Sequence, residues 1–582
     1  MNLTRRQFIA LMSSAAAAGL LPHSTFAKTE DFYDFPFSGN VRLLHFTDCH
    51  AQLLPVYFRE PNTNIGIGDA SGRVPHVVGK NLLKLHPGLS EHYIHALTYL
   101  NFVEDAQRYG KVGGFAHLAS LVKQLRAEAG ENRTLLLDGG DTWQGSGTAY
   151  WTRGEDMVGA CNLLGVDVMT GHWEFTYDDS EVMERLKKVN GDFVAQNVFL
   201  TEEGLFDGKP AYDESSGHVF PPYVIKNLNG VRVAVIGQAY PYTPIANPQR
   251  FIPDWTFGIR ESELQETVAE IRNREKPNVV VLLSHNGADI DLKLASRVEG
   301  IDVIFGGHTH DGVLKAMEVS NRSGRTLVTN GGSNGKFLGV MDLTVRNGKV
   351  ADYHYRLLPV FSNMLTPDQE MQNYIEQVRK PYLDKLEEKI AIADDLLYRR
   401  GNFNGTFDQL ICEALNERLD TQIALSPGFR WGTTVLPGQA ITMEHILDQT
   451  CMTYPETYAT EMTGQQLKLI FEDVCDNLFN PDPYLQQGGD MVRVTGMNYV
   501  CDPTASTGER ITDMQLDNGE AIEPDKSYKV SGWATVGSKS PGGPVWDVVA
   551  DYLRDKKVAS VKKLNMPKLV NIDHNLGWSK LI

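Results

Sequence analysis

Short apolar runs alternate with helical spacing between Val41 and Leu358. Two segments, Ala116–Ala129 and Glu261–Arg274, carry apolar residues at the spacing of amphipathic helices. The alternation predicts an α/β fold in which helices cover buried sheets. Six runs, each bounded by Gly, Asp or Asn, are typical of buried β-strands: Val41–Phe46, Thr134–Leu137, Val166–Thr170, Val231–Gly237, Val279–Ser284 and Ile301–Phe305.

Three stretches depart from this alternation. Residues 51–110 are rich in Pro, Gly, Asn and Tyr and only weakly periodic, which predicts a long ordered excursion over the surface. Residues 365–393 are charged, with apolar side chains at helical spacing, so we expect a connector helix. Residues 394–582 predict a second, α+β domain, with two helices and two strand-like runs at Phe407–Leu419, Thr463–Phe479, Val492–Cys501 and Ser527–Thr535.

The first 27 residues have the features of an export signal. The Arg5-Arg6 pair precedes an apolar stretch at residues 9–21, and residues 25–27 offer a small-residue cleavage site. The apolar stretch is short for a membrane span, and the other interpretation is an amphipathic first helix. The order Thr-Arg-Arg-x-Phe resembles twin-arginine signals, which export folded proteins. We therefore expect a periplasmic protein that has no membrane segment after cleavage, with residues 28–364 as its first domain.

Composition excludes several classes of protein. With 42% hydrophobic and 22% charged residues, the 582-residue chain is not disordered, fibrous or a multi-span membrane protein. Acidic residues outnumber basic ones by 73 to 55, and a net charge of −18 disfavours binding to nucleic acid. Six cysteines without a CxxC motif predict one disulfide or none. Cys49, which lies between two candidate metal ligands, is interpreted as a small buried filler.

Carboxylate and imidazole side chains follow five of the predicted strands. The carboxyl ends of strands in α/β sheets line ligand crevices, and residues two apart in an extended chain point the same way. One Asp or His at a strand end is ordinarily a cap or a surface residue, but five such segments in order predict a common site. The segments are Asp48-Cys49-His50, Gly139-Gly140-Asp141, Gly171-His172-Trp173-Glu174, Ser284-His285-Asn286 and Gly307-His308-Thr309-His310.

The donor set limits the choice of metal. Two aspartates and five histidines form a mixed oxygen and nitrogen set, which suits Mn²⁺, Zn²⁺ or Fe²⁺ and argues against Ca²⁺ or Mg²⁺ alone. Seven ligands exceed the needs of one tetrahedral site, so we expect two divalent ions that share Asp141.

Four of these segments resemble the motifs of the calcineurin-like dinuclear metallophosphoesterases of the 5′-nucleotidase family. They lie at residues 44–50, 138–146, 171–175 and 306–310, and the likeness continues at 425–430, 463–467 and 494–499. It implies a four-layer αββα N-terminal domain and a C-terminal substrate domain of the 5′-nucleotidase type. It also implies that Asp141 bridges two ions, one held with Asp48, His50 and His310, the other with His172, His285 and His308.

The third motif departs from the family pattern. The family has a metal-binding Asn and a leaving-group His where this chain has His172 and Trp173. His172 can still bind metal, whereas Trp173 has only an indole N–H. A positioned acid contributes roughly 10²–10⁴ in rate, so its loss favours a leaving group that is already a good anion, such as a persulfide. The alternative is that Trp173 only packs, in a nucleotidase with its proton donor elsewhere. Residues 540–546 lack the family's Gly-Gly-Asp-Gly-aromatic stretch, which places a nucleobase clamp in doubt.

These departures, with residues 47–53 and 56–62, resemble the thiosulfohydrolase branch of the family, which belongs to the periplasmic sulfur-oxidation (Sox) system. The resemblance implies that a metal-activated hydroxide releases sulfate from a cysteine S-thiosulfonate on the carrier protein SoxYZ, at a dimanganese centre. Asp141, Trp173 and Arg430 are the catalytic candidates, and Arg430, Trp173 and Tyr454 are the substrate-binding ones. Arg430 would offer a forked donor to the sulfonate, or else form an inter-domain salt bridge. Three aromatic residues either line a channel or belong to the core, namely Trp431, Tyr454 and Trp546.

Other functions stay open on the sequence alone. A periplasmic 5′-nucleotidase or another phosphoesterase would use the same metals, and a non-catalytic binding protein could retain the fold. The 51–110 excursion either shapes access for the carrier or is a passive insertion. Its histidines, His76, His86, His92 and His95, lack metal-ligand spacing and take no role.

Overall fold

The predicted strands form two six-stranded mixed sheets in the computed structural model, which describes residues 32–537 and 539–579. The expected signal at residues 1–27 therefore lies outside the described residues. The first sheet has the order β14-β13-β1-β2-β3-β4, with β1 to β4 parallel. Its strands are β1 (Val41–Phe46), β2 (Thr134–Asp138), β3 (Val168–Met169), β4 (Asp192–Phe193), β13 (Phe337–Arg346) and β14 (Lys349–Pro359).

The second sheet has the order β11-β12-β10-β9-β7-β6, in which β12, β10, β9 and β7 are parallel. Because parallel neighbours end at the same edge, this sheet also presents several carboxyl ends together. Its strands are β6 (Tyr223–Leu228), β7 (Val231–Gln238), β9 (Val279–Ser284), β10 (Val303–Gly306), β11 (Met317–Asn321) and β12 (Gly324–Asn330).

Apolar side chains fill the space between the two sheets. Val41 and Leu43 of the first sheet belong to one buried cluster with Val233 and Val281 of the second. Alternate residues point to the opposite faces, so the outer face of the second sheet packs on α12 (Glu261–Glu270) and α13 (Ala288–Arg297). A π-helical turn, Ile271–Glu275, ends the predicted helix that begins at Glu261.

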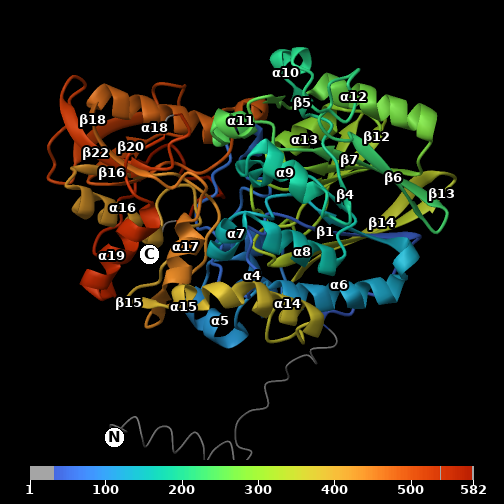
Figure 1. The fold of residues 1–582 in the computed structure, drawn as a ribbon, viewed down its shortest axis with the longest axis horizontal. Helices are drawn as coiled ribbons and strands as arrows, with labels where there is room; N and C mark the ends of the chain where they lie inside the picture. The colour runs from blue at the N-terminus through green and yellow to red at the C-terminus, as the bar shows by residue number, and fades with distance from the viewer. Residues whose placement is uncertain (1–31, 538, 580–582) are drawn as a thin grey trace, which may run out of the picture. The chain divides into compact units, whose positions relative to one another are not determined.

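The outer face of the first sheet packs on α6 (Phe115–Ala129), where Phe115 meets Phe46 edge to face at 6.2 Å. Two further helices pack beside α6, namely α8 (Glu155–Leu164) and α14 (Gln369–Arg379). Figure 1 shows α12 and α13 on one side of the sheets and α6 and α14 on the other. The predicted four-layer αββα order is therefore present.

The predicted connector helix at 365–393 is only partly helical. Asp368 caps α14 by accepting a hydrogen bond from the backbone of Met371. Pro381 lacks an N–H donor, and the chain there tightens into a 3₁₀ turn at Lys380–Tyr382 before α15 (Leu383–Leu386). Beyond Leu386 the prediction is wrong, because Lys389–Ala393 forms β15, a strand of the next domain.

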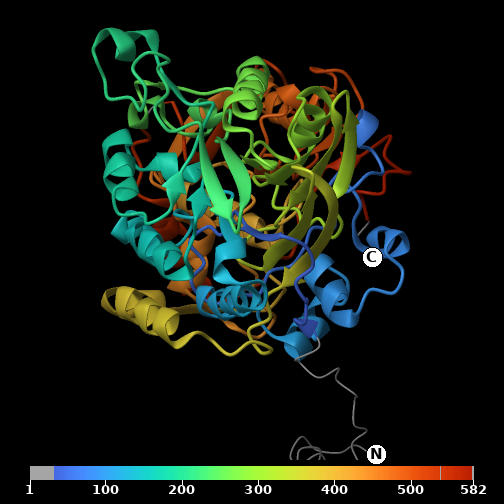
Figure 2. The ribbon, with the colours of Figure 1, turned by 90° about the vertical axis from the view of Figure 1, so that its right-hand side faces the viewer.

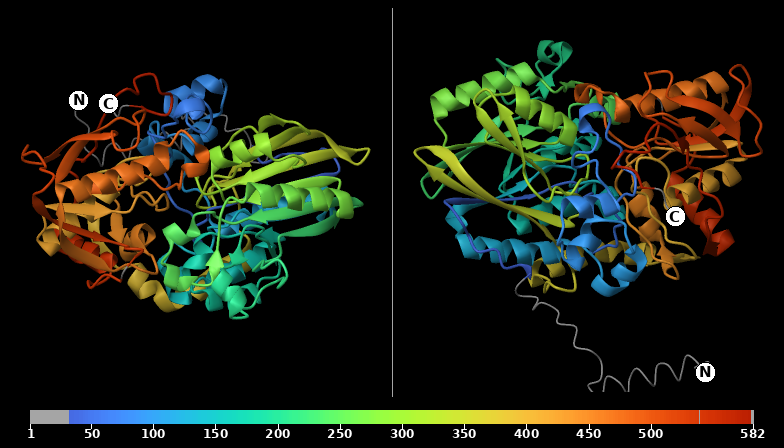
Figure 3. Two further views of the ribbon diagram at one scale, coloured as in Figure 1. Left: turned by 90° about the horizontal axis from the view of Figure 1, so that it is seen from above. Right: turned by 180° about the vertical axis from the view of Figure 1, so that it is seen from behind.

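The 51–110 excursion is ordered, as predicted, and contains α3 (Gly79–Leu85), α4 (Glu91–Leu97) and α5 (Phe102–Tyr109). Figure 2 shows these helices, in blue, near the sheets, and Figure 3 shows them beside the red C-terminal segment. Thr63 pairs with Trp578 in a β-bridge, and the backbone N–H of Val78 donates to the Leu576 carbonyl at 3.1 Å. The excursion thus joins the N-terminal domain to the end of the chain.

In the part of the C-terminal domain that the structure describes, three small sheets pack with four helices of eight residues or more. The sheets have the orders β17-β15-β23, β18-β22-β16-β19 and β21-β20-β24. The predicted run Val492–Cys501 divides at Gly496, whose φ of +85° separates β19 from β20. The helices are α16 (Thr406–Leu419), α17 (Met443–Thr450), α18 (Gly464–Phe479) and α19 (Val545–Lys556). The strands are β16 (Ile423–Ser426), β17 (Ala440–Thr442), β18 (Thr457–Thr463), β19 (Arg493–Thr495), β20 (Met497–Cys501), β21 (Ile511–Leu516), β22 (Ser527–Trp533), β23 (Val558–Ala559) and β24 (Lys568–Leu569).

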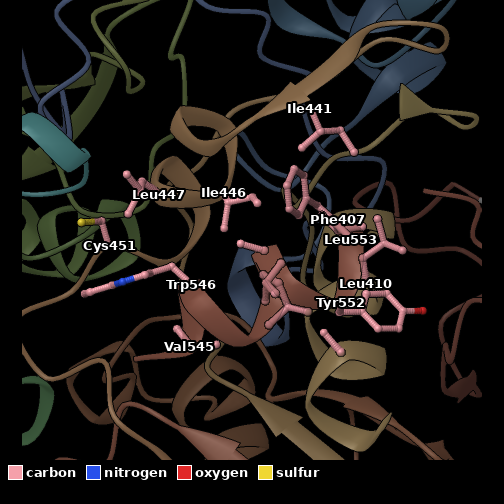
Figure 4. Packing of buried hydrophobic residues seen from close by; sticks show 14 of the residues in the cluster. Phe407, Leu410, Ile441, Ile446, Leu447, Cys451, Val545, Trp546, Tyr552 and Leu553 are labelled. Carbon is pink, nitrogen blue, oxygen red and sulfur yellow. The ribbon is translucent and has the colours of Figure 1, made fainter. Parts of the chain in front are cut away.

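One hydrophobic core of this domain lies where α16, α17 and α19 meet, and another lies around α18. Figure 4 shows Phe407, Ile446 and Leu553 packed together in the first core, with Trp546 in the same cluster. Trp546 also packs on Tyr150 at 5.1 Å between ring centroids. Trp546 is therefore a core residue, and it is not among the described residues that line the cavity at the metal centre. All six cysteines are buried and free.

Candidate metal centre

All seven predicted metal ligands lie just beyond the carboxyl ends of five strands. The first sheet contributes those that follow β1, β2 and β3, and the second sheet those that follow β9 and β10. The packed sheets bring these strand ends to one place, so residues far apart in the chain become neighbours. In chain order the ligands are Asp48, His50, Asp141, His172, His285, His308 and His310.

Five of these ligands have a left-handed backbone, with φ between 46° and 72°. Side chains other than glycine rarely adopt this region, and strain of this kind concentrates at functional sites. Hydrogen bonds between the strand-end loops hold the conformation, because the N–H of Asp48 donates to the Gly140 carbonyl and that of His50 to the Asp141 carbonyl, both at 2.8 Å. The five residues are Asp48, His50, Asp141, His308 and His310.

The seven side chains form two buried clusters that share Asp141. Within each cluster, the candidate ligand atoms lie within 4.8 Å of one another. One cluster contains Asp48, His50, Asp141 and His310, and the other contains Asp141, His172, His285 and His308. These are the two ligand sets that the family resemblance implies, with Asp141 in the bridging position.

The spacing of the donor atoms fits metal ions. His172 Nδ1 and His285 Nε2 each lie 3.1 Å from an oxygen of Asp141, and His50 Nε2 lies 3.1 Å from His310 Nε2. Two donors that are each about 2.1 Å from one ion, at right angles, are separated by about 3 Å. The residues present therefore fit a pair of divalent ions.

Burial prepares most of the ligands in their metal-binding protonation states. It lowers the pKa of His50 to about 4 and holds the pKa values of His308 and His310 well below the usual range, so these imidazoles are neutral. Burial alone would raise the pKa of Asp141, but His172 and His285 hold it well below its ordinary value. The exceptions are Asp48, whose pKa burial raises, and His285: burial lowers the pKa of His285, yet Asp141 and Asp48 raise it to about 10, so an ion bound there must displace a proton.

Outer contacts orient the ligands. His285 Nδ1 lies 2.6 Å from the Gly139 carbonyl, which accepts its proton and turns Nε2 toward Asp141. The carboxylate of Glu174 accepts backbone N–H bonds from Thr142 at 2.7 Å, His172 at 2.8 Å and Asp141 at 3.1 Å. Glu174 therefore ties two ligand loops together, a role that its place in the third motif does not reveal.

A cavity of about 220 Å³ opens onto the metal centre and is lined by residues of both domains. All three predicted substrate-contacting residues, Arg430, Trp173 and Tyr454, line it. Arg430 Nη2 donates to the Gly489 carbonyl at 2.6 Å, and Arg430 Nε lies 3.5 Å from Asp490 Oδ1. Its carboxylate partner belongs to its own domain, so Arg430 does not form the alternative inter-domain salt bridge.

Aromatic rings form one wall of this cavity. Trp173 stacks on His172 at 4.8 Å and meets Phe429 and Trp431 edge to face. Its backbone N–H donates to Asp141 Oδ1 at 2.8 Å. Trp431 lines the cavity while belonging to the C-terminal core, and the hydroxyl of Tyr454 donates to the Ala246 carbonyl at 2.6 Å.

Two residues beside the cavity were not predicted. Tyr240, which follows β7, packs on His172 and His308. Buried Arg400 donates to the Thr309 carbonyl at 2.8 Å, next to two ligands. Tyr240 could have been predicted, because ligand crevices form at the carboxyl ends of strands in α/β sheets. Arg400 lies in a loop, where no sequence pattern marks it as a site residue.

Family models and solved structures place this arrangement among known proteins. A model described as calcineurin-like phosphoesterase matches residues 41–312, and one described as 5′-nucleotidase, C-terminal domain matches residues 391–547. The sulfate thiohydrolase SoxB of Thermus thermophilus, solved with glycerol, is 36% identical, with a TM-score of 0.86 over 93% of this chain and 98% of that one. A 5′-nucleotidase precursor from Thermus thermophilus is 21% identical, with a TM-score of 0.71 over 91% and 99%, and shares the fold.

Curated relatives agree at the level of the family. The trifunctional nucleotide phosphoesterase protein YfkN of Bacillus subtilis is 27% identical over 469 residues, 73% of this chain and 31% of that protein. The chain thus spans about a third of the length of YfkN. Protein UshA of Yersinia enterocolitica is 23% identical over 500 residues, 77% of this chain and 85% of that protein.

Two packed sheets with buried Asp and His clusters at one edge, roofed by a second domain, define a two-domain hydrolase of the metallophosphoesterase class. The chain belongs to the 5′-nucleotidase family of calcineurin-like metallophosphoesterases. Within the described residues, no helix is long and apolar enough to cross a membrane.

Proposed function

We propose that this protein is a thiosulfohydrolase of the SoxB type. It hydrolyses the terminal S–S bond of a cysteine S-thiosulfonate. Water adds its oxygen to the sulfone sulfur, sulfate is released, and the cysteine keeps a persulfide while two protons pass to solvent. The 36% identity to the sulfate thiohydrolase SoxB, across nearly the full length of both chains, supports this choice of reaction.

The absence of a proton donor at the leaving-group position carries the proposal. Among the described residues that line the cavity, the titratable groups besides the metal ligands are Tyr240, Tyr454 and Arg430. Both tyrosine hydroxyls already donate to backbone carbonyls, and burial raises the pKa of each well above its usual value. A nucleotide alkoxide would leave poorly here, whereas a persulfide is a stable anion and needs no proton.

Residues of both domains bind and orient this substrate in the proposal. The Arg430 guanidinium, a planar forked donor, faces the sulfonate oxygens. The rings of Trp173, Phe429 and Trp431 contact the divalent sulfur atoms, because sulfur packs favourably against aromatic rings. Two divalent ions at the seven ligands would supply a nucleophile at neutral pH and withdraw charge from the sulfone. The mixed donor set suits manganese, which we propose for both positions.

The cellular setting follows from the same proposal. Residues 1–27 direct export by the twin-arginine pathway, which delivers the protein to the periplasm. There it acts on SoxYZ, a carrier protein that bears the cysteine-linked substrate. The segment that corresponds to the nucleotidase base clamp favours a thiosulfohydrolase over a nucleotidase, since Gly542 and Gly543 pair with the backbone of Thr457 and do not line the cavity.

Sulfate release from a cysteine S-thiosulfonate peptide tests the proposal. The protein is stripped with a chelator, reloaded with Mn²⁺, Zn²⁺ or Mg²⁺, and assayed for sulfate by ion chromatography and, in parallel, for phosphate from AMP. We expect Mn²⁺-dependent sulfate release and negligible phosphate. Phosphate release without sulfate would establish the alternative, a periplasmic 5′-nucleotidase.

A further inference from the structure

Tyr240 lies between the two halves of the cavity. It follows β7 of the N-terminal domain, and its side chain is buried. Its ring stacks on His308 with 4.2 Å between centroids and lies 4.0 Å from the ring of His172. The ring of Tyr240 therefore contacts two ligands of the same candidate metal position.

The hydroxyl of Tyr240 holds a loop of the opposite domain. It donates to the carbonyl of Gln487, within the loop formed by residues 484–490. At the start of this loop, Tyr242 makes a second bond of the same kind, from its hydroxyl to the Tyr484 carbonyl. Tyr242 packs on Tyr240 edge to face at 6.0 Å, but it does not line the cavity.

The far end of the 484–490 loop holds Arg430. The Gly489 carbonyl accepts from Arg430 Nη2 at 2.6 Å, and Asp490 lies beside the same guanidinium. Asp490 is itself fixed, because Asn402 Nδ2 and Arg493 Nη2 donate to its two oxygens at 3.2 and 3.1 Å. Between these contacts, the loop packs closely against the metal ligand His308. A Cβ added to Gly488 would lie 2.1 Å from His308 Nε2.

We propose that Tyr240 is a positioning residue that sets Arg430 over the metal ligands. One side chain contacts His172 and His308 with its ring and the Arg430-bearing loop with its hydroxyl. Two contacts between the domains therefore set the distance between the oxyanion-binding guanidinium and the metal ligands: the Tyr240 hydroxyl holds the loop at Gln487, and Arg430 Nη1 donates to the His308 carbonyl at 3.4 Å. This link between the domains favours substrates whose anionic group fits that distance. The inference rests on the proposed function only in assigning Arg430 to the sulfonate.

A double-mutant cycle tests this link. Tyr240→Phe keeps the ring against both histidines and removes only the bond to Gln487. Tyr242→Phe is the matched control, because it removes the equivalent bond at the other end of the loop. Both are combined with Arg430→Lys, and kcat, KM and bound metal are measured for each variant of the Mn²⁺-loaded protein on the S-thiosulfonate peptide.

We expect Tyr240→Phe to lower kcat/KM about tenfold, mainly through KM, with bound metal unchanged. Tyr242→Phe should change kcat/KM by less than about twofold, and Tyr240→Phe should add less than about twofold in the Arg430→Lys background. Additive losses, an equal effect of Tyr242→Phe, or loss of metal would overturn the proposal. If the wild-type protein releases phosphate from AMP and no sulfate, the same cycle on AMP still tests the link, since Arg430 then faces a phosphate.

Discussion

The floor and the roof of the cavity are built on different principles. The floor consists of seven ligands at the ends of five strands, all in residues 48–310 and at most 9% exposed. The roof consists of loops of the C-terminal domain, chiefly residues 427–431 and 487–489. Strand ends hold the metal ligands with little freedom, whereas loops can vary in length and composition. We therefore expect the metal ligands of the floor to determine the class of reaction, and the loops of the roof to determine which substrate is bound.

Trp173 is where the two regions meet. It belongs to a strand-end segment of the floor, yet its ring packs on Phe429 and Trp431 of the roof. Trp173 stands where the family has a leaving-group His. It therefore removes a proton donor for the leaving group and also changes the shape of the aromatic cavity wall.

The largest expected effect comes from the floor. Asp141→Asn removes the carboxylate shared by both clusters, and we expect activity to fall by about three orders of magnitude or more, because several kcal/mol of transition-state stabilisation depend on the ions. Elemental analysis should show less than two ions per chain. The control is Asp192→Asn, an ion-paired aspartate with a 46% exposed side chain on β4. Retained metal and activity in Asp141→Asn would contradict the bridging role.

The second-largest effect is expected at Trp173, where the floor and the roof meet. Trp173→His restores an imidazole next to His172, and we expect phosphate release from AMP to rise about tenfold or more. Sulfate release should not rise, because a persulfide needs no proton. Trp173→Phe is the matched control, since it opens space without supplying an acid. Equal gains from both variants would show that the wall, and not the missing proton, limits AMP hydrolysis.

A smaller effect is expected from the contacts that orient the floor. Glu174→Gln places an amide N–H₂ among backbone N–H donors, so we expect metal affinity to fall about tenfold and stability by roughly 1–3 kcal/mol. Titration calorimetry with Mn²⁺ and thermal unfolding measure the two losses. Glu155→Gln, at an exposed ion pair, is the control. If Glu174→Gln has the unfolding temperature and the metal affinity of the wild type, Glu174 does not orient the metal ligands.

The smallest effect concerns a contact between the two domains away from the metal ligands. Gln52, near His50, lies 3.3 Å from Asp448 of α17, and burial, with Glu444, raises the pKa of Asp448 to about 8. An unfolded aspartate titrates near 3.9, so the folded state binds the extra proton. Its contribution is fully present below about pH 4 and is lost as pH rises toward about 8.

Asp448→Asn should remove this dependence. We expect little change in stability near pH 4 and a relative stabilisation of about 1 kcal/mol or more near pH 8–9, reduced by any relaxation of the buried site. Chemical denaturation across this range measures the difference. A constant difference at all pH values would show that Asp448 does not titrate between the two states.

The floor could be predicted from sequence because each ligand lies next to a recognisable strand. Asp48 and His50 follow one fully buried strand, and His308 and His310 follow another. Because ligand sites in α/β sheets lie at the carboxyl ends of strands, this was enough to predict that the four side chains share one site. Long buried strands and amphipathic helices were predicted for the same reason, since their burial pattern is local.

The roof could not be predicted in this way. Arg430 was found by family resemblance, while Asp490 and the 484–490 loop acquire meaning only through contacts with residues up to 247 positions away. The helix predicted at 365–393 ended early for a similar reason, because β15 is stabilised by pairing with β17 and β23. Non-local partners decided each case.

The central claim is that the leaving group departs without protonation. It is tested most directly with S-sulfonates of thiols that span a wide range of thiol pKa, by measuring kcat/KM for sulfate release. We predict that the rate falls steeply as the pKa of the leaving thiol rises, and that Trp173→His flattens this dependence. A rate independent of leaving-group pKa in the wild-type protein, with the sulfur-bond cleavage limiting, would contradict the account.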